Sequence, residues 1–269
     1  MDFQGAAAER NADAIEAAAF RDFYAAAPAA LRLRVEDVAG AAVLIAPTLP
    51  VAFFNRVIGL GNASPATAGD IAAIRRFYAD AGVKDYIVHA VPSAQPANLA
   101  DLLRDTGFAP GQRRSWAKFL RTAADAPRVR ADLELREAGT ADATAVASVV
   151  TTAFGMPSSV GPWFAALIGR PGWRLWVAQA GDQVIATGAL YVRGDRGWLG
   201  AGATLADHRG QGAQTALLAK RIRAAEEMGC SVVATETGEP VADEPNPSLA
   251  NIRRAGFVQV CSRLNYVPV

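Results

Sequence analysis

One stretch of the chain constrains its fold more than any other. Residues 200–229 read as a strand of small residues, a turn with two glycines and a helix that ends at Gly229. The helix is predicted because residues 213–227 are mostly strong helix formers, with apolar side chains at spacings of three and four. A strand that turns directly into a long helix is typical of α/β proteins.

The turn between this strand and this helix carries the chemistry. Gly210 and Gly212 have no side chains that would block a close approach to the backbone. The first N–H groups of a helix lack partners within the helix, and the helix dipole adds positive potential there. Together with the charge of Arg209, these features predict a site for phosphate oxygens. The alternative is that the two glycines only turn a strand into a helix.

The loop sequence RGQGAQ, residues 209–214, resembles the pyrophosphate loop of the GNAT acyltransferase superfamily, whose pattern is Arg/Gln-x-x-Gly-x-Gly/Ala. It also follows a strand and opens a long helix, as in that family. The resemblance implies that successive backbone N–H groups of the loop bind acetyl-CoA (coenzyme A). The chain departs from the pattern at Gln214, so this side chain either points away from the phosphates or contacts them.

The order of elements after Leu133 extends the resemblance over the second half of the chain. We expect a strand, two helices, three antiparallel strands, the loop, a helix, a strand, a helix and a closing strand. Gly256 and Phe257 also resemble the closing segment of GNAT proteins. The expected fold class is therefore α/β (α+β), with a mixed, mostly antiparallel sheet flanked by helices.

The first half repeats this order in a weaker form. A helix ending at Gly82, a strand at 86–91, a helix at 96–106 and then Gly107-Phe108 match the second half at a nearly constant offset. The alternative is two generic α/β units that happen to align. We predict two GNAT-like domains: residues 1–125, degenerate and without a phosphate loop, and residues 126–269, the acetyltransferase domain.

The expected role of the first domain is to brace the sheet or to wall the acceptor pocket. A further strand is predicted at residues 51–60. Phe53, Phe54 and Arg56 in it are placed to reach the pocket, although core packing is the alternative for the two phenylalanines.

Charge and cysteine usage exclude several other classes of protein. The net charge is +1 and no basic block is present, which argues against nucleic acid and anionic membrane as partners. The sequence shows no stretch as long as a membrane span and no signal peptide, so we expect a cytoplasmic protein. Cys230 and Cys261 are the only cysteines and lack metal-ligand spacing, so they are read as buried free thiols and no metal site is predicted. The alternative is a disulfide between them, which needs an oxidising compartment.

The predicted cofactor site extends from the loop to its neighbours. GNAT proteins polarise the thioester carbonyl with a backbone N–H where the strand before the loop bulges, and residues 200–202 are glycine-rich in mid-strand, which suits a bulge. The alternative, compatible with a bulge, is close packing against the opposite face of the sheet. The register with the loop then places Gly202 and Thr204 along the pantetheine arm. The predicted cofactor-binding residues are Gly202, Thr204, Arg209, Gly210, Gln211, Gly212, Ala213, Gln214, Asn246, Ser248 and Asn251. Asn246 and Ser248 have an alternative role as helix caps.

Two residues are predicted to be catalytic. Glu236 ends the strand after the long helix and is the candidate general base; the alternatives are a solvated surface carboxylate and a relay through water. GNAT proteins often place a proton-donating Tyr four residues before the Gly of Gly-Phe, but Ile252 stands there. Tyr266 or Tyr191 is the candidate substitute, with core packing as the alternative.

The expected activity follows from the resemblance. We expect an N-acyltransferase that moves an acetyl group from acetyl-CoA to a primary amine of a small molecule or protein, in a direct ternary complex. Met156, Trp163 and Phe164 are predicted to contact an acceptor with an apolar part, with helix core as the alternative for the two aromatic residues. The rival functions are an acyl-CoA sensor or pseudo-enzyme, and a protein-interaction module without turnover.

Overall fold

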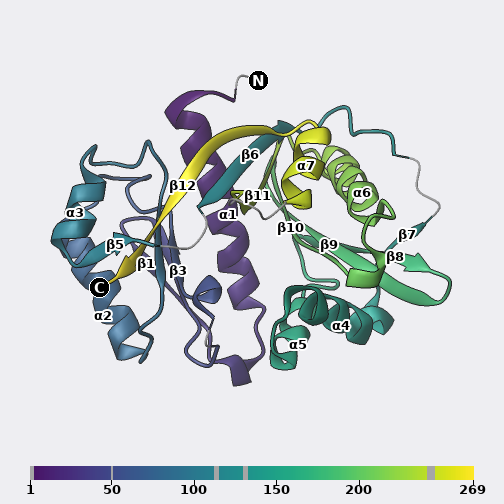
Figure 1. The fold of residues 1–269 in the computed structure, drawn as a ribbon, viewed down its shortest axis with the longest axis horizontal. Helices are drawn as coiled ribbons and strands as arrows, with labels where there is room; N and C mark the ends of the chain where they lie inside the picture. The colour runs from purple at the N-terminus through teal and green to yellow at the C-terminus, as the bar shows by residue number, and fades with distance from the viewer. Residues whose placement is uncertain (1–2, 50, 112–114, 130–132, 241–245) are drawn as a thin grey trace. The chain divides into compact units, whose positions relative to one another are not determined.

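The computed structural model describes residues 3–49, 51–111, 115–129, 133–240 and 246–269 (Figure 1). These residues form two compact units. The first unit comprises residues 1–120, 236–249 and 259–269, and the second comprises residues 121–235 and 250–258. The division expected at residue 125 puts residues 236–249 and 259–269 in the second domain, whereas here they pack with the first unit.

The sheet of the first unit has the strand order β1-β2-β3-β4-β12-β6, and β5 also pairs with β12. The ladder between β3 and β4 is parallel, whereas β1 with β2, β2 with β3, and β12 with β4 and β5 are antiparallel. The strands are β1 (Arg34–Val38), β2 (Ala41–Ile45), β3 (Arg56–Ile58), β4 (Ile87–Ala90), β5 (Phe108–Pro110), β6 (Trp116–Thr122) and β12 (Val258–Pro268). The helices are α1 (Gly5–Ala25), α2 (Ala68–Asp80) and α3 (Leu99–Asp105).

The strand predicted at residues 51–60 is much shorter in the structure. A 3₁₀ turn, Ala52–Phe54, precedes the three-residue strand β3. The buried Asn55 explains the break, because its side-chain Oδ1 accepts from the Ala46 N–H at 2.7 Å. A side chain that bonds the backbone in this way competes with the strand ladder.

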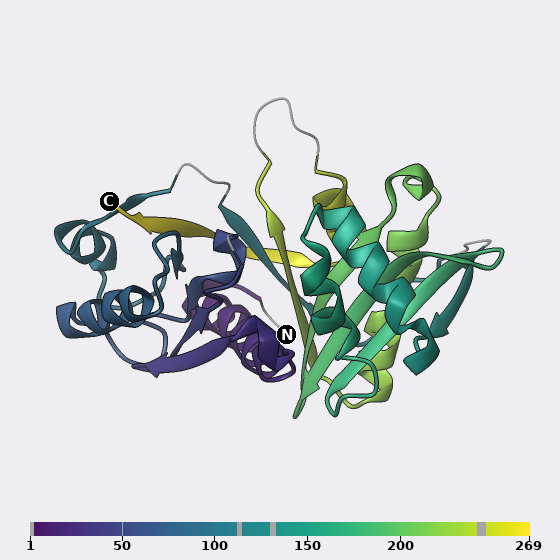
Figure 2. The ribbon, with the colours of Figure 1, turned by 90° about the horizontal axis from the view of Figure 1, so that it is seen from below.

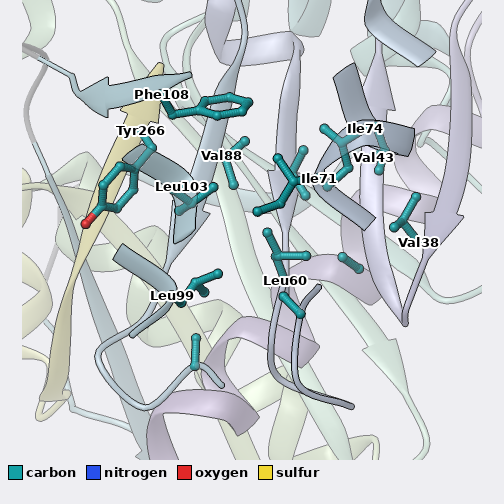
Figure 3. Packing of buried hydrophobic residues seen from close by; sticks show 14 of the residues in the cluster. Val38, Val43, Leu60, Ile71, Ile74, Val88, Leu99, Leu103, Phe108 and Tyr266 are labelled. Atoms are coloured by element: carbon teal, nitrogen blue, oxygen red, sulfur yellow. The ribbon is translucent and has the colours of Figure 1, made fainter. Parts of the chain in front are cut away.

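The apolar core of the first unit lies between its sheet and α2 and α3 (Figure 3). Helix α2 starts at a capping box in which Thr67 and Asp70 satisfy each other's backbone N–H. Its next turns bury Ile71 and Ile74 against the strands. This element is the helix that was expected to end at Gly82.

The second unit follows the predicted order of elements as far as the last helix, whereas the closing strand β12 belongs almost entirely to the first unit. Its sheet has the strand order β11-β10-β9-β8-β7, parallel between β10 and β11 and antiparallel elsewhere. The strands are β7 (Glu134–Glu137), β8 (Trp173–Ala180), β9 (Gln183–Arg193), β10 (Arg196–Thr204) and β11 (Val232–Gly238), whose last residues belong to the first unit. The helices are α4 (Ala143–Phe154), α5 (Gly161–Ala165), α6 (Ala213–Glu227) and the second half of α7 (Pro247–Arg254).

The two sides of this second sheet are covered by different helices. Helix α6 packs on β8, β9 and β10, and α4 packs on β9 and β10. Figures 1 and 2 show α6 on one face and α4 with α5 on the other. A mostly antiparallel sheet flanked by helices confirms the predicted fold class. Among the residues described, no helix has the length and apolar character needed to cross a membrane.

Candidate functional site

The predicted phosphate loop lies between a short 3₁₀ turn, Ala206–His208, and α6. Gly210 and Gly212 adopt φ angles of 79° and 83°, a region that residues with side chains rarely occupy. A Cβ atom at either position would meet nothing within 4 Å, so the loop needs glycine for its backbone conformation and not for packing. Residues 209–212 are exposed, with open space around the backbone.

The N-terminus of α6 is open to an anion. Gly212 is the N-cap residue, and among the described residues no side chain caps the helix and no acidic residue lies in its first turn. The unpaired N–H groups, the helix dipole and the exposed Arg209 therefore act in the same direction.

The structure shows where the side chain of Gln214 points, at the position where the loop departs from the family pattern. Its Nε2 atom lies 3.6 Å from the position that a Cβ of Gly202 would take, so the side chain reaches β10. The amide thus points toward the strand. The loop keeps its open backbone with Gln214 in place of a small residue.

The predicted bulge in β10 is present. Gly200 pairs with Ala189 and Ala203 pairs with Thr187, so β10 has one more residue than β9 between the two pairs. Ala201, at φ 50°, carries the strain of this extra residue.

The bulged part of β10 also lies beyond the end of its pairing with β11, the strand on its other side. The parallel ladder with β11 ends at the pair Trp198 and Ala234. Beyond it, the side-chain hydroxyl of Thr235 donates to the Leu199 carbonyl at 2.8 Å. The strand ends there separate where the family resemblance places the thioester.

Thr204 completes a line of candidate contacts along β10. Its Oγ1 atom is buried and has no hydrogen-bond partner among the described residues. A buried hydroxyl without a partner is costly, so it marks a position where a ligand atom or water would bond. The bulge, this hydroxyl and the glycine loop follow one another in the second unit.

The polar residues around the start of α7 make contacts within the protein. Asn246 accepts from the Leu249 N–H at 3.1 Å and donates to Thr237 Oγ1 at 3.3 Å, which is the geometry of a helix cap. Asn251 accepts a hydrogen bond from Arg254. Ser248 is half-buried in the first turn of α7. Cofactor contacts by these three residues stay a prediction.

Glu236 lies in β11 and its side chain is only 8 % exposed, so it is not a solvated surface carboxylate. Its Oε2 accepts from Lys118 Nζ at 3.1 Å, and the same ammonium donates to Glu16 Oε2 at 2.6 Å. Burial, and then the charge of Glu16, raise the pKa of Glu236 above its usual range against the opposing pull of Lys118. A carboxylate with a raised pKa suits proton acceptance near neutral pH.

Sequence reasoning missed the ion cluster to which Glu236 belongs. Glu16 also forms ion pairs with Arg263 at 2.5 Å and with Arg56 at 3.3 Å. All of these side chains are almost completely buried. The ion cluster consists of Asp13, Glu16, Arg56, Lys118, Glu236 and Arg263. The sequence does contain one indication of this cluster: Asp13 and Glu16 lie on the same face of the first helix as the apolar Ala12, Ile15 and Ala19.

Arg56 is held inside the first unit and is thus a core residue. Its guanidinium lies 4.1 Å from the ring centre of Phe20 and 4.2 Å from that of Phe53. Phe54 is fully buried. Phe54 is therefore a core residue, which was the alternative to a place in the acceptor pocket. Phe53 is only half-buried.

The remaining predicted site residues lie mostly in apolar cores. Tyr266 is 2 % exposed and belongs to the core cluster of the first unit, where Figure 3 shows it at one edge near Leu103. Trp163 is fully buried and Phe164 nearly so, with their rings 6.1 Å apart in α5. Met156, in the loop before α5, is half-buried. Helix core is the reading that these contacts favour for the two aromatic residues of α5.

Comparison with known proteins agrees with this geometry. Residues 148–246 match the model of the acetyltransferase (GNAT) family. The chain therefore carries a domain of the GNAT family, as the glycine loop predicts. A search of curated proteins finds no match.

Solved structures extend the likeness to the whole chain. A GCN5-related N-acetyltransferase from Kribbella flavida has a TM-score of 0.65 and 18 % identity, with 95 % of each chain covered. One from Sphaerobacter thermophilus has a TM-score of 0.59 and 17 % identity, covering 84 % of this chain and 79 % of that one. A tandem GNAT protein from the clavulanic acid biosynthesis pathway has a TM-score of 0.57 and 17 % identity, covering 84 % and 77 %. At these identities the likeness concerns the fold.

Proposed function

We propose that this protein is an N-acetyltransferase that binds acetyl-CoA along β10 and at the N-terminus of α6, and transfers the acetyl group to a primary amine of a small molecule or protein. One observation carries the proposal: a bulged strand leads through an open glycine loop to an uncapped helix N-terminus. The cytoplasmic location remains part of the proposal, and two buried free thiols agree with it.

The residues of the second unit fit the two ends of acetyl-CoA. Arg209 and the first N–H groups of α6 would bind the pyrophosphate oxygens. The Thr204 hydroxyl, which lacks a partner among the described residues, would bond the pantetheine arm. The bulge at Ala201 and Gly202 would present a backbone N–H to the thioester carbonyl, whose polarisation is a main contribution to acyl transfer.

Glu236 would accept the proton of the amine. The acceptor nitrogen forms a bond to the carbonyl carbon, the carbon–sulfur bond breaks, and the thiolate of coenzyme A leaves. Lys118 holds the Glu236 carboxylate in place through its hydrogen bond. Tyr266 lies in an apolar core, so the proposal leaves the proton donor to the thiolate unassigned.

Calorimetry with acetyl-CoA tests the binding step. We expect wild-type protein to bind and Arg209→Ala to bind about tenfold or more weakly, because a charge-assisted phosphate contact contributes ~1.5–3 kcal/mol. Arg223→Ala is the matched control, since Arg223 is an exposed arginine on α6, away from the loop. Absence of binding by the wild type would refute the proposal and favour a protein-interaction module.

Turnover separates an enzyme from a sensor. Ile252 at the position of the usual Tyr is the observation that favours an acyl-CoA sensor or pseudo-enzyme. Release of free thiol from acetyl-CoA, followed with a panel of primary amines, would exclude that rival. Glu236→Gln should then lower turnover by about 10²-fold or more while leaving acetyl-CoA affinity unchanged.

A further inference from the structure

Arg221, on α6, is a buried cation without a carboxylate partner among the described residues. It is 2 % exposed. Its Nε atom donates to the Leu217 carbonyl at 3.0 Å, and its Nη1 atom donates to the Ala189 carbonyl at 3.2 Å and to the Gly200 carbonyl at 3.0 Å. Burial lowers the pKa of this guanidinium to about 10.

The guanidinium lies at the β10 bulge. Ala189 and Gly200 are the last strand pair before the register shifts. On the far side of the bulge, Nη2 lies 3.6 Å from the position of a Cβ on Gly202. Gly188 leaves room for the group, because a Cβ there would be 2.7 Å from Arg221 Cζ. The side chain therefore spans the whole bulge and accounts for a glycine in the adjacent strand.

A buried guanidinium without an ion partner is expensive, and an apolar side chain on this helix face would avoid the cost. Leu217 and Ile222, its buried neighbours on α6, show what this face otherwise holds. The contacts of Arg221 indicate a role for its charge, because the guanidinium donates to backbone carbonyls at the bulge of β10.

The hydrogen bond from Arg221 to the Gly200 carbonyl also fixes the direction of the next backbone donor, the Ala201 N–H. The peptide group is planar and trans, so the Ala201 N–H points opposite to the Gly200 carbonyl. Holding that carbonyl toward α6 directs the Ala201 N–H away from α6. A cation on the carbonyl oxygen also polarises the peptide and strengthens its N–H as a donor.

We propose that Arg221 is a positioning residue that orients and polarises the Gly200–Ala201 peptide at the β10 bulge, so that the bulge donates a hydrogen bond to the thioester carbonyl of acetyl-CoA. This inference rests on the proposed function, because it assigns a task to a residue within the same site. It concerns recognition of the acyl carbonyl, and leaves the binding of the phosphates to the loop.

Two variants and one control test the inference. Arg221→Met removes the charge and keeps an unbranched side chain, whereas Gly188→Ala keeps the charge and displaces the guanidinium. Arg223→Met is the matched control, being the same substitution at an exposed position two residues further along α6. Circular dichroism establishes that each variant is folded, and Gly188→Ala maintains the test if Arg221→Met does not fold.

The measurements compare acetyl-CoA with coenzyme A, which lacks the acyl carbonyl. We expect both test variants to keep the affinity for coenzyme A within about twofold and to lose preference for acetyl-CoA by about fivefold or more, as for one lost hydrogen bond. Amide hydrogen exchange should become faster at residues 200–203 in both variants and remain unchanged in Arg223→Met.

The outcomes separate this inference from the proposed function. If the wild type binds acetyl-CoA and both test variants keep its preference over coenzyme A, Arg221 has no such role and the proposed function stands. If the wild type binds neither compound, the proposed function fails and this inference fails with it.

Discussion

Lys118 bridges two buried carboxylates, and the same substitution should destabilise the protein at one of them and not at the other. The Lys118 ammonium donates a hydrogen bond to Glu16 at 2.6 Å and another to Glu236 at 3.1 Å. Glutamine has nearly the same shape as glutamate, so Glu16→Gln and Glu236→Gln differ mainly in the charge that each removes. Each variant serves as the control for the other.

Glu16→Gln should be strongly destabilising. Glu16 is the shared partner of Lys118, Arg263 and Arg56, and its removal leaves buried cations with too little negative charge. Breaking a buried ion pair costs about 3–5 kcal/mol. For a chain of this size each kcal/mol lowers the melting temperature by roughly 2–4 °C, so the expected loss is about 6–20 °C.

Glu236→Gln should leave the free energy of unfolding unchanged or raise it at neutral pH. Lys118 keeps its shorter bond to Glu16 in this variant. Burial and the charge of Glu16 raise the pKa of Glu236, which means that its ionised form is disfavoured in the folded state. Removing the ionised form therefore removes an unfavourable contribution.

The dependence on pH has opposite signs for the two groups. Burial alone would raise the pKa of Glu16, but Arg263, Lys118 and Arg56 together hold it well below 4.5. Its stabilising contribution is present above that pH and is lost as the pH falls toward the lowered pKa. For Glu236 the pKa is raised, so its contribution is present below 4.5 and is lost as the pH rises through the raised value.

Thermal unfolding of both variants and the wild type, measured between about pH 4 and pH 8, tests this reasoning. The gap between wild type and Glu16→Gln should shrink as the pH falls below 4.5. Equal destabilisation by the two substitutions at pH 7, or a melting temperature of Glu16→Gln within about 2 °C of wild type, would refute the assigned roles of the carboxylates.

Three further predictions follow from packing and burial. Gly200→Ala should destabilise the protein by about 1–3 kcal/mol in chemical denaturation, because a Cβ there falls 1.8 Å from the Trp198 ring. Cys230 and Cys261, whose thiol pKa values burial raises to about 11 and about 12, should react with a thiol reagent at pH 8 only after unfolding; fast labelling of the native protein would contradict this. Thr67→Ala should cost about 1 kcal/mol by removing the capping box of α2, and an unchanged denaturation midpoint would show that the cap contributes little.

Local patterns predicted the second unit well, because its signals are local. The helix at 213–227 follows from helix formers and apolar spacing, and the loop before it from two glycines that adopt positive φ. The bulge was predictable for the same reason, since glycines in mid-strand relieve the close approach that a bulge requires.

The missed features depend on contacts between residues far apart in the chain. Glu16 meets Lys118 and Arg263 only because α1, β6 and β12 pack in the same unit, and no spacing along the sequence records this. Arg221 is a charged residue among the apolar side chains of α6, and the sequence does not record that it is buried and faces two carbonyls of β9 and β10. The break before β3 likewise depends on Asn55 bonding a residue of the preceding loop.

The ion cluster gives the first unit a part in the proposed chemistry beyond bracing a sheet. A carboxylate as buried as Glu236 would hold its proton too tightly for a base if burial acted alone. Lys118, Arg56 and Arg263 lower its pKa, while Glu16 raises it again, so the balance of these charges decides when it ionises. The helix α1 that carries Glu16 therefore both stabilises the fold and adjusts the proposed base. On this argument, the charges that keep the proposed base able to exchange its proton all come from the first unit.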